Sequence, residues 1–328
     1  MLLCQNPINL IRYLMILRVN SSLVYFPRYI SIELSSILGC IIANRLPTNE
    51  SYIWRKALDI KSKLGFYPHI VDKPWPIEAV LFVYPGKKTY GRGEFIFWEL
   101  KLFGESADHG FFLESILPAM EEASYISDPE VNYPNSLWGS FDIHSVYVAH
   151  GGKWENLVNE GILNLRYQAS PFHWSDGLDM EKEYKEPTRL AWVTPFNINK
   201  RPRIDSKKSG NKNKPQQNLL LGDIISSLLD RIKILGYDPD NLVDSLSVPE
   251  IMELADQVTV MHSKFENAHN SPSGCRIGSQ ILSYIPEPLI PYLQLASILH
   301  IGKYTHFGCG TFSLIRSTSD LVGSAIPK

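Results

Sequence analysis

The sequence predicts an α+β protein made of two halves that share one order of secondary structure. Apolar strand-like segments alternate with helix-like segments in the order strand, helix, strand, strand, helix, strand, and this order occurs twice. A chain of 328 residues is long enough for two domains, and a hydrophobic content of 44% is typical of a folded protein. A doubled βαββαβ order predicts two tandem ferredoxin-like domains.

In the first half, four apolar segments have the length and composition of strands, and two others have helical periodicity. The predicted elements are a strand at 10–19, a helix at 30–46, strands at 79–84 and 94–103, a helix at 110–124 and a strand at 141–150. Glycines at 86, 91 and 93 supply the turn between the two middle strands. The last strand runs into Gly151 and Gly152, which end the unit.

The second half repeats this order. Its predicted elements are a strand at 189–198, a helix at 219–235, a short helix at 249–257, strands at 258–265 and 276–284, a helix at 288–299 and a strand at 311–316. The helix at 219–235 is clearly amphipathic, because its leucines and isoleucines fall on one face. Pro195 is expected to end or edge the pairing of the first strand, whereas Pro288 fits the first turn of its helix.

These elements predict three regions along the chain. An N-terminal ferredoxin-like domain is expected at 1–152 and a C-terminal ferredoxin-like domain, carrying a glycine-rich loop, at 188–328. The connection at 153–187 is polar and rich in aromatic residues, and its pattern indicates no particular secondary structure.

Charge is unevenly distributed along the chain. The net charge is −2, but the segment 198–217 holds seven lysines and arginines against one aspartate, a net of +6, so the remainder carries −8. A basic arm on an acidic body can attract nucleic acid locally. A solvated loop without a partner is an equally good interpretation of this segment taken alone.

The cysteines and the N-terminus indicate the compartment. Four cysteines lie at 4, 40, 275 and 309 and form no CxxC pair, which argues against a zinc site or a disulfide framework and favours a reducing cytoplasm. The apolar N-terminus is interrupted by Arg12 and Arg18 and lacks the pattern of a signal peptide. No uninterrupted apolar run is long enough to span a membrane. We therefore expect a cytoplasmic protein with no cofactor, no bound metal and no membrane contact.

The most distinctive segment is 300–312, His-Ile-Gly-Lys-Tyr-Thr-His-Phe-Gly-Cys-Gly-Thr-Phe. Its three glycines, at 302, 308 and 310, bracket a lysine and a histidine. Glycine permits positive φ and lets backbone N–H groups approach an anion closely. Lysine and histidine add positive charge and groups that transfer protons. The segment is therefore expected to bind a phosphate backbone, although a simple turn before the last strand is the alternative.

Three further segments strengthen this interpretation by their order. Residues 90–95 (Tyr-Gly-Arg-Gly-Glu-Phe) precede 99–104 (Glu-Leu-Lys-Leu-Phe-Gly), and residues 189–195 (Arg-Leu-Ala-Trp-Val-Thr-Pro) open the second half. Together with the segment 300–312, they resemble the CRISPR-associated endoribonucleases that cut repeat RNA, a family of the RAMP superfamily. The resemblance covers most of the chain, and its most specific part is the similarity to that family's C-terminal glycine-rich loop.

The resemblance implies two RRM-like folds side by side, with an RNA hairpin or repeat bound across them. It also implies metal-independent cleavage of precursor guide RNA, in which the ribose 2′-OH attacks the adjacent phosphorus and leaves 2′,3′-cyclic phosphate and 5′-OH ends. The expected partners are CRISPR repeat RNA or guide RNA and other CRISPR-associated subunits of an interference complex.

Cleavage without a metal needs a proton acceptor, a proton donor and a cation beside the phosphate. His306 and His300 are the candidates for proton transfer, because the ordinary pKa of histidine is about 6.5. Lys303 is the candidate cation, and Tyr29 precedes the first helix, where family members often keep catalytic groups. The residues expected to contact RNA are Gly302, Lys303, Tyr304, Thr305, Gly308, Gly310, Arg28, Arg276, Lys207 and Lys208.

One departure from the family leaves a second hypothesis open. Family members often carry a catalytic histidine on or near the first helix, and residues 1–68 contain no histidine. This favours, as the alternative, a non-catalytic guide-RNA-binding subunit of an interference complex. A third class, a small-molecule α/β enzyme, receives no support from the sequence motifs, since HExxH, Walker, GxSxG and dinucleotide-binding patterns are all missing.

Overall fold

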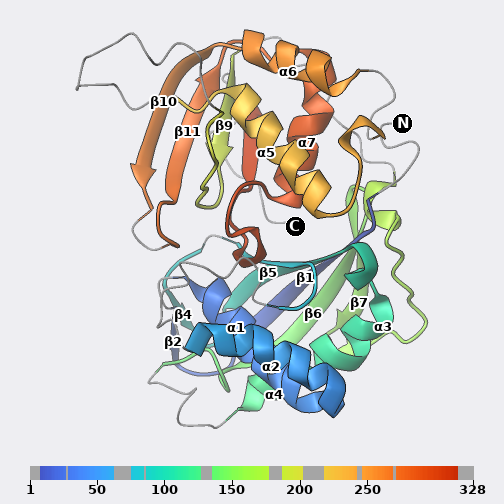
Figure 1. The fold of residues 1–328 in the computed structure, drawn as a ribbon. Helices are drawn as coiled ribbons and strands as arrows, with labels where there is room; N and C mark the ends of the chain where they lie inside the picture. The colour runs from blue at the N-terminus through green and yellow to red at the C-terminus, as the bar shows by residue number, and fades with distance from the viewer. Residues whose placement is uncertain are drawn as a thin grey trace.

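The computed structural model describes residues 8–26, 29–62, 75–84, 86–126, 135–176, 187–201, 218–241, 246–268 and 271–316. These ranges form a six-stranded sheet, a four-stranded sheet and a small two-stranded sheet. Helices cover one face of each large sheet, and the two sheets lie in opposite halves of the molecule (Figure 1). The observed architecture is a mixed α+β fold with antiparallel sheets, as the sequence predicts.

The six-stranded sheet is built around β1 (Leu10–Val19). The other strands are β3 (Ala79–Val83), β5 (Phe95–Phe103), β6 (Phe141–His150), β7 (Lys153–Asn159) and β8 (Ile162–Leu163). They are ordered β3-β5-β1-β6-β7-β8, and every neighbouring pair is antiparallel. The central position of β1 follows from its composition, since eight of its ten residues are apolar and pairing on both edges buries most of them.

Helices from two parts of the chain cover this sheet. They are α1 (Ile30–Arg45), α2 (Thr48–Ser62), α3 (His109–Phe111), a π-helical turn (Phe112–Ile116) and α4 (Leu117–Tyr125). Alternate residues of β1 and β5 form the core beneath them, because successive side chains of a strand point to opposite faces. The core includes Tyr13, Met15, Trp98, Leu100, Leu34 and Leu38.

The four-stranded sheet consists of β9 (Thr188–Trp192), β10 (Val260–Asn267), β11 (Arg276–Leu282) and β12 (Phe312–Arg316). Its order is β10-β11-β9-β12, again antiparallel throughout. Three helices pack with it: α5 (Leu221–Ile234), α6 (Val248–Gln257) and α7 (Ile290–Leu299).

The two halves share one topology. If the strands of each βαββαβ unit are numbered in chain order, the spatial order is second, third, first, fourth in both cases, β3-β5-β1-β6 and β10-β11-β9-β12. This doubled order is consistent with ferredoxin-like folds.

Several elements differ from the sequence prediction. Strands β7 and β8 lie within the segment 153–187 and continue the first sheet beyond β6. Strand β9 ends at Trp192, short of the predicted residue 198, since Pro195 has no N–H to donate. A small sheet of β2 (Leu23–Tyr25) and β4 (Thr89–Gly91) was not predicted.

Helix α2 was also missed by the sequence analysis. It contains many polar residues, and its stability comes from tertiary packing rather than from a strong apolar stripe. Trp54 of α2 packs against Trp75, with ring centroids 5.5 Å apart, and Trp75 Nε1 donates a hydrogen bond of 2.7 Å to Ser35 O in α1.

The two halves are joined by a continuous apolar core. Leu10, Val80, Phe82 and Phe103 of the first sheet point away from α1 and pack in the same cluster as α5 and α7. Thus one face of the first sheet meets its own helices and the opposite face meets the second half. None of the helices in the described ranges has the length and apolar character needed to cross a bilayer.

Candidate functional site

The candidate site is built on the segment 300–312, which we call the glycine-rich loop. It connects α7 to β12, contains one 3-10 turn at Thr305–Phe307, and packs against β3 and α1 of the first half. In Figure 1 it is the dark red segment between the two sheets. The fold therefore brings the distinctive C-terminal sequence against the start of the first helix.

Two of the loop glycines are required by packing. Gly308 and Gly310 have φ values of +77° and +87°, which side-chain-bearing residues rarely adopt. A Cβ atom at Gly308 would lie 2.7 Å from Leu81 O, and one at Gly310 would lie 1.9 Å from Ile301 O. These glycines let the loop fold tightly on itself and on β3.

Several backbone amides of the loop donate hydrogen bonds within the protein. Ile301 N donates to Gly310 O at 3.0 Å, Gly308 N to Thr305 O at 2.8 Å and Gly310 N to Pro195 O at 2.9 Å. Lys303 N donates to Asn197 O at 2.9 Å. The expectation that Gly308 and Gly310 present their N–H groups to an anion is therefore not met in this conformation. Any phosphate contact here has to come from other groups.

The side chain of Lys303 projects from the loop into solvent. Its side chain is exposed, whereas Thr305, His306 and Phe307 of the 3-10 turn are buried. Gly302 and Tyr304 are half-buried, and Tyr304 has a left-handed backbone with φ of +62°. The loop thus holds its ammonium group outward on a rigid base.

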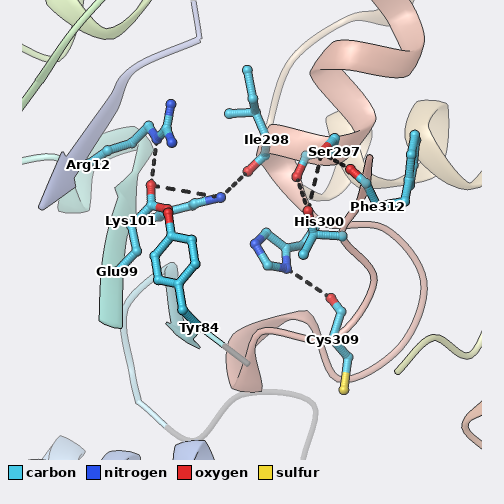
Figure 2. A network of polar contacts seen from close by, with 10 residues as sticks. Arg12, Tyr84, Glu99, Lys101, Ser297, Ile298, His300, Cys309 and Phe312 are labelled. Carbon is cyan, nitrogen blue, oxygen red and sulfur yellow. Dashed lines mark hydrogen bonds and ion pairs between the residues drawn. The ribbon is translucent and has the colours of Figure 1, made fainter. Parts of the chain in front are cut away.

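His300 shapes the loop from inside. It has no exposed surface, has a φ of +59°, and its Nδ1 lies 3.1 Å from Cys309 O (Figure 2). Burial lowers the pKa of this imidazole well below its ordinary value, and the charge of Lys101 adds to the effect. In this conformation His300 is a neutral ring that closes the loop, and it does not reach the molecular surface.

Tyr29 joins the loop from the first half of the chain. Its phenol donates to Phe307 O at 2.8 Å and lies 3.0 Å from Cys309 Sγ. Burial raises the pKa of Tyr29 well above its ordinary value, with a further contribution from Cys309. The phenol is therefore protonated near neutral pH, and it ties the start of α1 to the loop.

Arg276 lies close to the loop through a short segment after β9. Its guanidinium carbon is 5.3 Å from the ring centroids of both Phe196 and Phe265. Phe196 and Arg276 exchange backbone hydrogen bonds of 2.8 and 2.9 Å, and the next residue, Asn197, accepts the bond from Lys303 N. The other predicted RNA contacts, Arg28, Lys207 and Lys208, lie outside the described residues.

A buried polar network beneath the loop was not predicted from the sequence. Glu99 and Lys101 of β5 and Arg12 of β1 lie on the sheet face that meets the second half (Figure 2). Arg12 Nε lies 2.5 Å from Glu99 Oε1, and Lys101 Nζ donates to Ile298 O in α7 at 2.7 Å. One signal was present in the sequence, namely two charged residues at alternate positions of an otherwise apolar strand.

Within the described ranges, no three His, Cys, Asp or Glu side chains are grouped so that they could hold a metal ion.

Comparison with known proteins adds information on the fold. No protein-family model and no curated protein matches the sequence. Among solved structures, a chain of a "Partial Cas6-RT-Cas1--Cas2 complex" matches with a TM-score of 0.55 at 12% identity, covering 100% of this chain and 50% of that one. A chain of a "Cas6-RT-Cas1--Cas2 complex" also gives 0.55 and 12%, covering 100% of this chain and 31% of that one.

A Cas6 product complex matches with a TM-score of 0.48 at 16% identity, covering 94% of this chain and 100% of that one. The chain spans about half or less of the two first-named relatives. At 12% identity, what the first two matches show is a shared fold. This chain shares, over its whole length, the α+β fold of part of each of those two chains.

The packing of the loop predicts a large effect of Gly310→Ala. The Cβ atom would meet Ile301 O, and a positive φ by itself costs about 1–2 kcal/mol for a residue other than glycine. We expect the free energy of unfolding in urea to fall by more than about 2 kcal/mol, since the clash adds to the backbone cost. Gly93→Ala is the matched control, because Gly93 has a φ of +85° and open space around it. Equal losses in the two variants would show that the loop is not tightly packed.

Proposed function

We propose that this protein is a RAMP-superfamily endoribonuclease that binds CRISPR repeat RNA and cleaves precursor guide RNA without a metal ion. The observation that supports this most strongly is the match of the whole chain to the fold of a Cas6-containing chain. The sequence resemblance of the segment 300–312 points to the same family independently. Guide RNA and other CRISPR-associated proteins are the partners that follow from the proposal.

Two tandem RRM-like domains are part of the proposal. The doubled strand order supports two ferredoxin-like units, with predicted bounds of 1–152 and 188–328. Because β7 and β8 of the intervening segment pair with the first sheet, we assign them to the first unit. An RNA strand that reaches the glycine-rich loop would then contact both units, since the loop packs on β3 and α1.

The proposed chemistry uses side chains rather than loop amides. Exposed Lys303 is placed to contact a phosphate, and His306 is the first candidate for proton transfer, from the 3-10 turn next to it. Tyr29 and His300 hold the loop in position, because both bond to its backbone carbonyl groups. The 2′-OH would attack the adjacent phosphorus, while the ammonium stabilises the charge that develops on the phosphate.

The alternative function is a guide-RNA-binding subunit that does not cut. Two observations favour it: residues 1–68 contain no histidine, and both candidate histidines, His300 and His306, are buried. Both functions use the same fold and the same exposed lysine, so they differ only in whether proton-transfer groups reach the RNA.

One assay separates these functions. The protein is incubated with a labelled CRISPR repeat RNA in EDTA, and the products are analysed for 2′,3′-cyclic phosphate and 5′-OH ends. Cleavage in EDTA with these ends supports the nuclease, and binding without cleavage supports the subunit. Cleavage that EDTA abolishes contradicts the metal-independent mechanism, and failure to bind RNA contradicts both hypotheses.

For Lys303→Ala we expect weaker RNA binding with a smaller salt dependence. A lysine that contacts one phosphate releases counterions on binding, so its removal should lower the slope of log affinity against log salt by about 0.7–0.9. The measurement is a fluorescence titration at several salt concentrations. Lys153→Ala, which removes an exposed lysine of β7, is the control. An unchanged slope in Lys303→Ala would rule out the phosphate contact.

For His306→Ala we expect cleavage to slow by about 100-fold or more, since a positioned acid or base contributes about 10²–10⁴-fold. RNA affinity should change little, because the exposed ammonium of Lys303 makes the proposed phosphate contact. Single-turnover cleavage and equilibrium binding are measured side by side, with His262→Ala, an exposed histidine of β10, as the control. Parallel losses of cleavage and binding would make His306 a positioning residue.

A further inference from the structure

Strand β5 places two charged side chains on a buried sheet face, where an unpaired charge would destabilise the fold. Its alternate residues Trp98, Leu100 and Leu102 pack under the helices of the first half, so Glu99 and Lys101 face the second half. Their exposed fractions are 1% and 3%. Buried charges destabilise a fold unless they are paired and hydrogen-bonded, so each must have a partner.

The partners of Glu99 come from its own sheet. Arg12 Nε lies 2.5 Å from Glu99 Oε1, and the Tyr84 hydroxyl donates to Glu99 Oε2 at 3.2 Å. Lys101 Nζ is 4.0 Å from Glu99 Oε1, which is too far for a hydrogen bond. The carboxylate is therefore satisfied mainly by Arg12 and Tyr84.

Lys101 instead bonds across the junction of the two halves. Its Nζ donates to Ile298 O at 2.7 Å, 197 residues further along the chain. Ile298 lies in the last turn of α7, where backbone carbonyls have no partner within the helix and where a positive charge is favourable. A side chain of the first sheet thus caps the helix that leads into the glycine-rich loop.

The loop begins two residues after this contact. His300 leaves the helix with a φ of +59° and closes the loop through Cys309 O. Ser297, one residue before Ile298, donates to Phe312 O and so links the same helical turn to the end of the loop (Figure 2). Both ends of the loop are therefore attached to the helical turn that Lys101 holds.

We propose that Lys101 is a positioning residue that fixes the glycine-rich loop by capping α7 from the first sheet. Its importance for RNA rests on the proposed function, but its effect on the loop does not. The side chain is almost fully buried, so it cannot contact RNA directly, and it acts through the main chain of residues 298–312.

The charges around Lys101 set its pKa, so its contribution to loop stability should depend on pH. The groups that face it are Glu99 of its own strand, Arg12 of β1, Tyr84 after β3, Arg231 of α5 and His300 after α7. Burial lowers the pKa of Lys101 to about 7, the charge of Glu99 opposes this, and Arg12 and Arg231 add to it.

The charged and titratable neighbours of Lys101 change their protonation outside the range from pH 7 to 9. Burial lowers the pKa of Arg231 to about 10 and that of His300 well below its ordinary value. Burial also raises the pKa of Tyr84, with the charge of Glu99 adding to it. Burial opposes ionisation of Glu99, but Arg12 and Lys101 lower its pKa overall. Between pH 7 and 9, Lys101 is the member of this group that changes its charge.

The sign of the pH effect follows from linkage. Lys101 has a pKa of about 7 when the loop is docked and an ordinary value of 10.5 when it is exposed to water. Protons therefore favour the undocked state, and docking becomes more stable as the pH rises from 7 towards 10.5. Below pH 7 the amine is protonated in both states, so the effect is constant there.

Hydrogen exchange of the full-length protein without RNA tests the proposal. In Lys101→Met, peptides covering 299–312 should exchange about tenfold faster at pH 8, because the hydrogen bond to Ile298 O is lost. Exchange in β1 and β6 should stay unchanged, and Lys153→Met, an exposed lysine of β7, should behave like the wild type. Unchanged exchange in the loop, or faster exchange throughout the chain, would overturn the proposal.

The pH profile of the wild type provides a second test that needs no variant. After correction for the intrinsic exchange rate, protection of 299–312 relative to β1 should rise by about tenfold or more between pH 7 and 9. The rise should be lost in Lys101→Met if that variant folds. A flat profile in the wild type would overturn the proposal even if the variant does not fold.

RNA binding separates the two proposals. If repeat RNA binds, Lys101→Met should weaken it several-fold while Lys153→Met does not. If repeat RNA does not bind the wild type, the proposed function fails, and the exchange data still decide the role of Lys101.

Discussion

The structure depends on how polar groups are satisfied where its two halves meet. The first sheet presents an ion pair and a buried amine to the second half in the middle of a shared apolar core. An apolar contact alone would allow the halves to slide, because it has no preferred direction. Hydrogen bonds to a helix end are directional, so the bond from Lys101 to Ile298 O selects one position of α7.

This constraint explains the form of the glycine-rich loop. The loop is held at its start by α7, along its length by Pro195 and Asn197, and from the first half by Tyr29. Its glycines serve close packing, and the amides of Gly308 and Gly310 are used inside the protein. What remains for a ligand is a set of side chains on a rigid base, with Lys303 outermost.

The shared fold and the site contribute differently to the proposed function. The similarity to part of a chain of a Cas6-RT-Cas1--Cas2 complex covers the whole of this chain and shows a shared fold. Both candidate histidines of the proposed nuclease are buried, and His300 is held as a neutral ring. The proposed cleavage therefore depends on His306 reaching the RNA, which the alternative function does not require.

The sequence by itself determined the order and type of most elements and the location of the glycine-rich segment. Those features follow from local periodicity, turn residues and composition, which act over a few residues. Helix α2 and strands β7 and β8 were not predicted, because tertiary pairing stabilises them more than local pattern does.

Only the tertiary structure decided what the site residues do. Tyr29 and Phe307 lie 278 residues apart in the chain and are in contact, and His300 turned inward rather than outward. In the sequence, Glu99 and Lys101 are two charged residues in an apolar strand. Their burial against the second half is visible only in the tertiary structure. Burial and partners set the ionisation and orientation of a side chain, and both depend on segments that are distant in sequence.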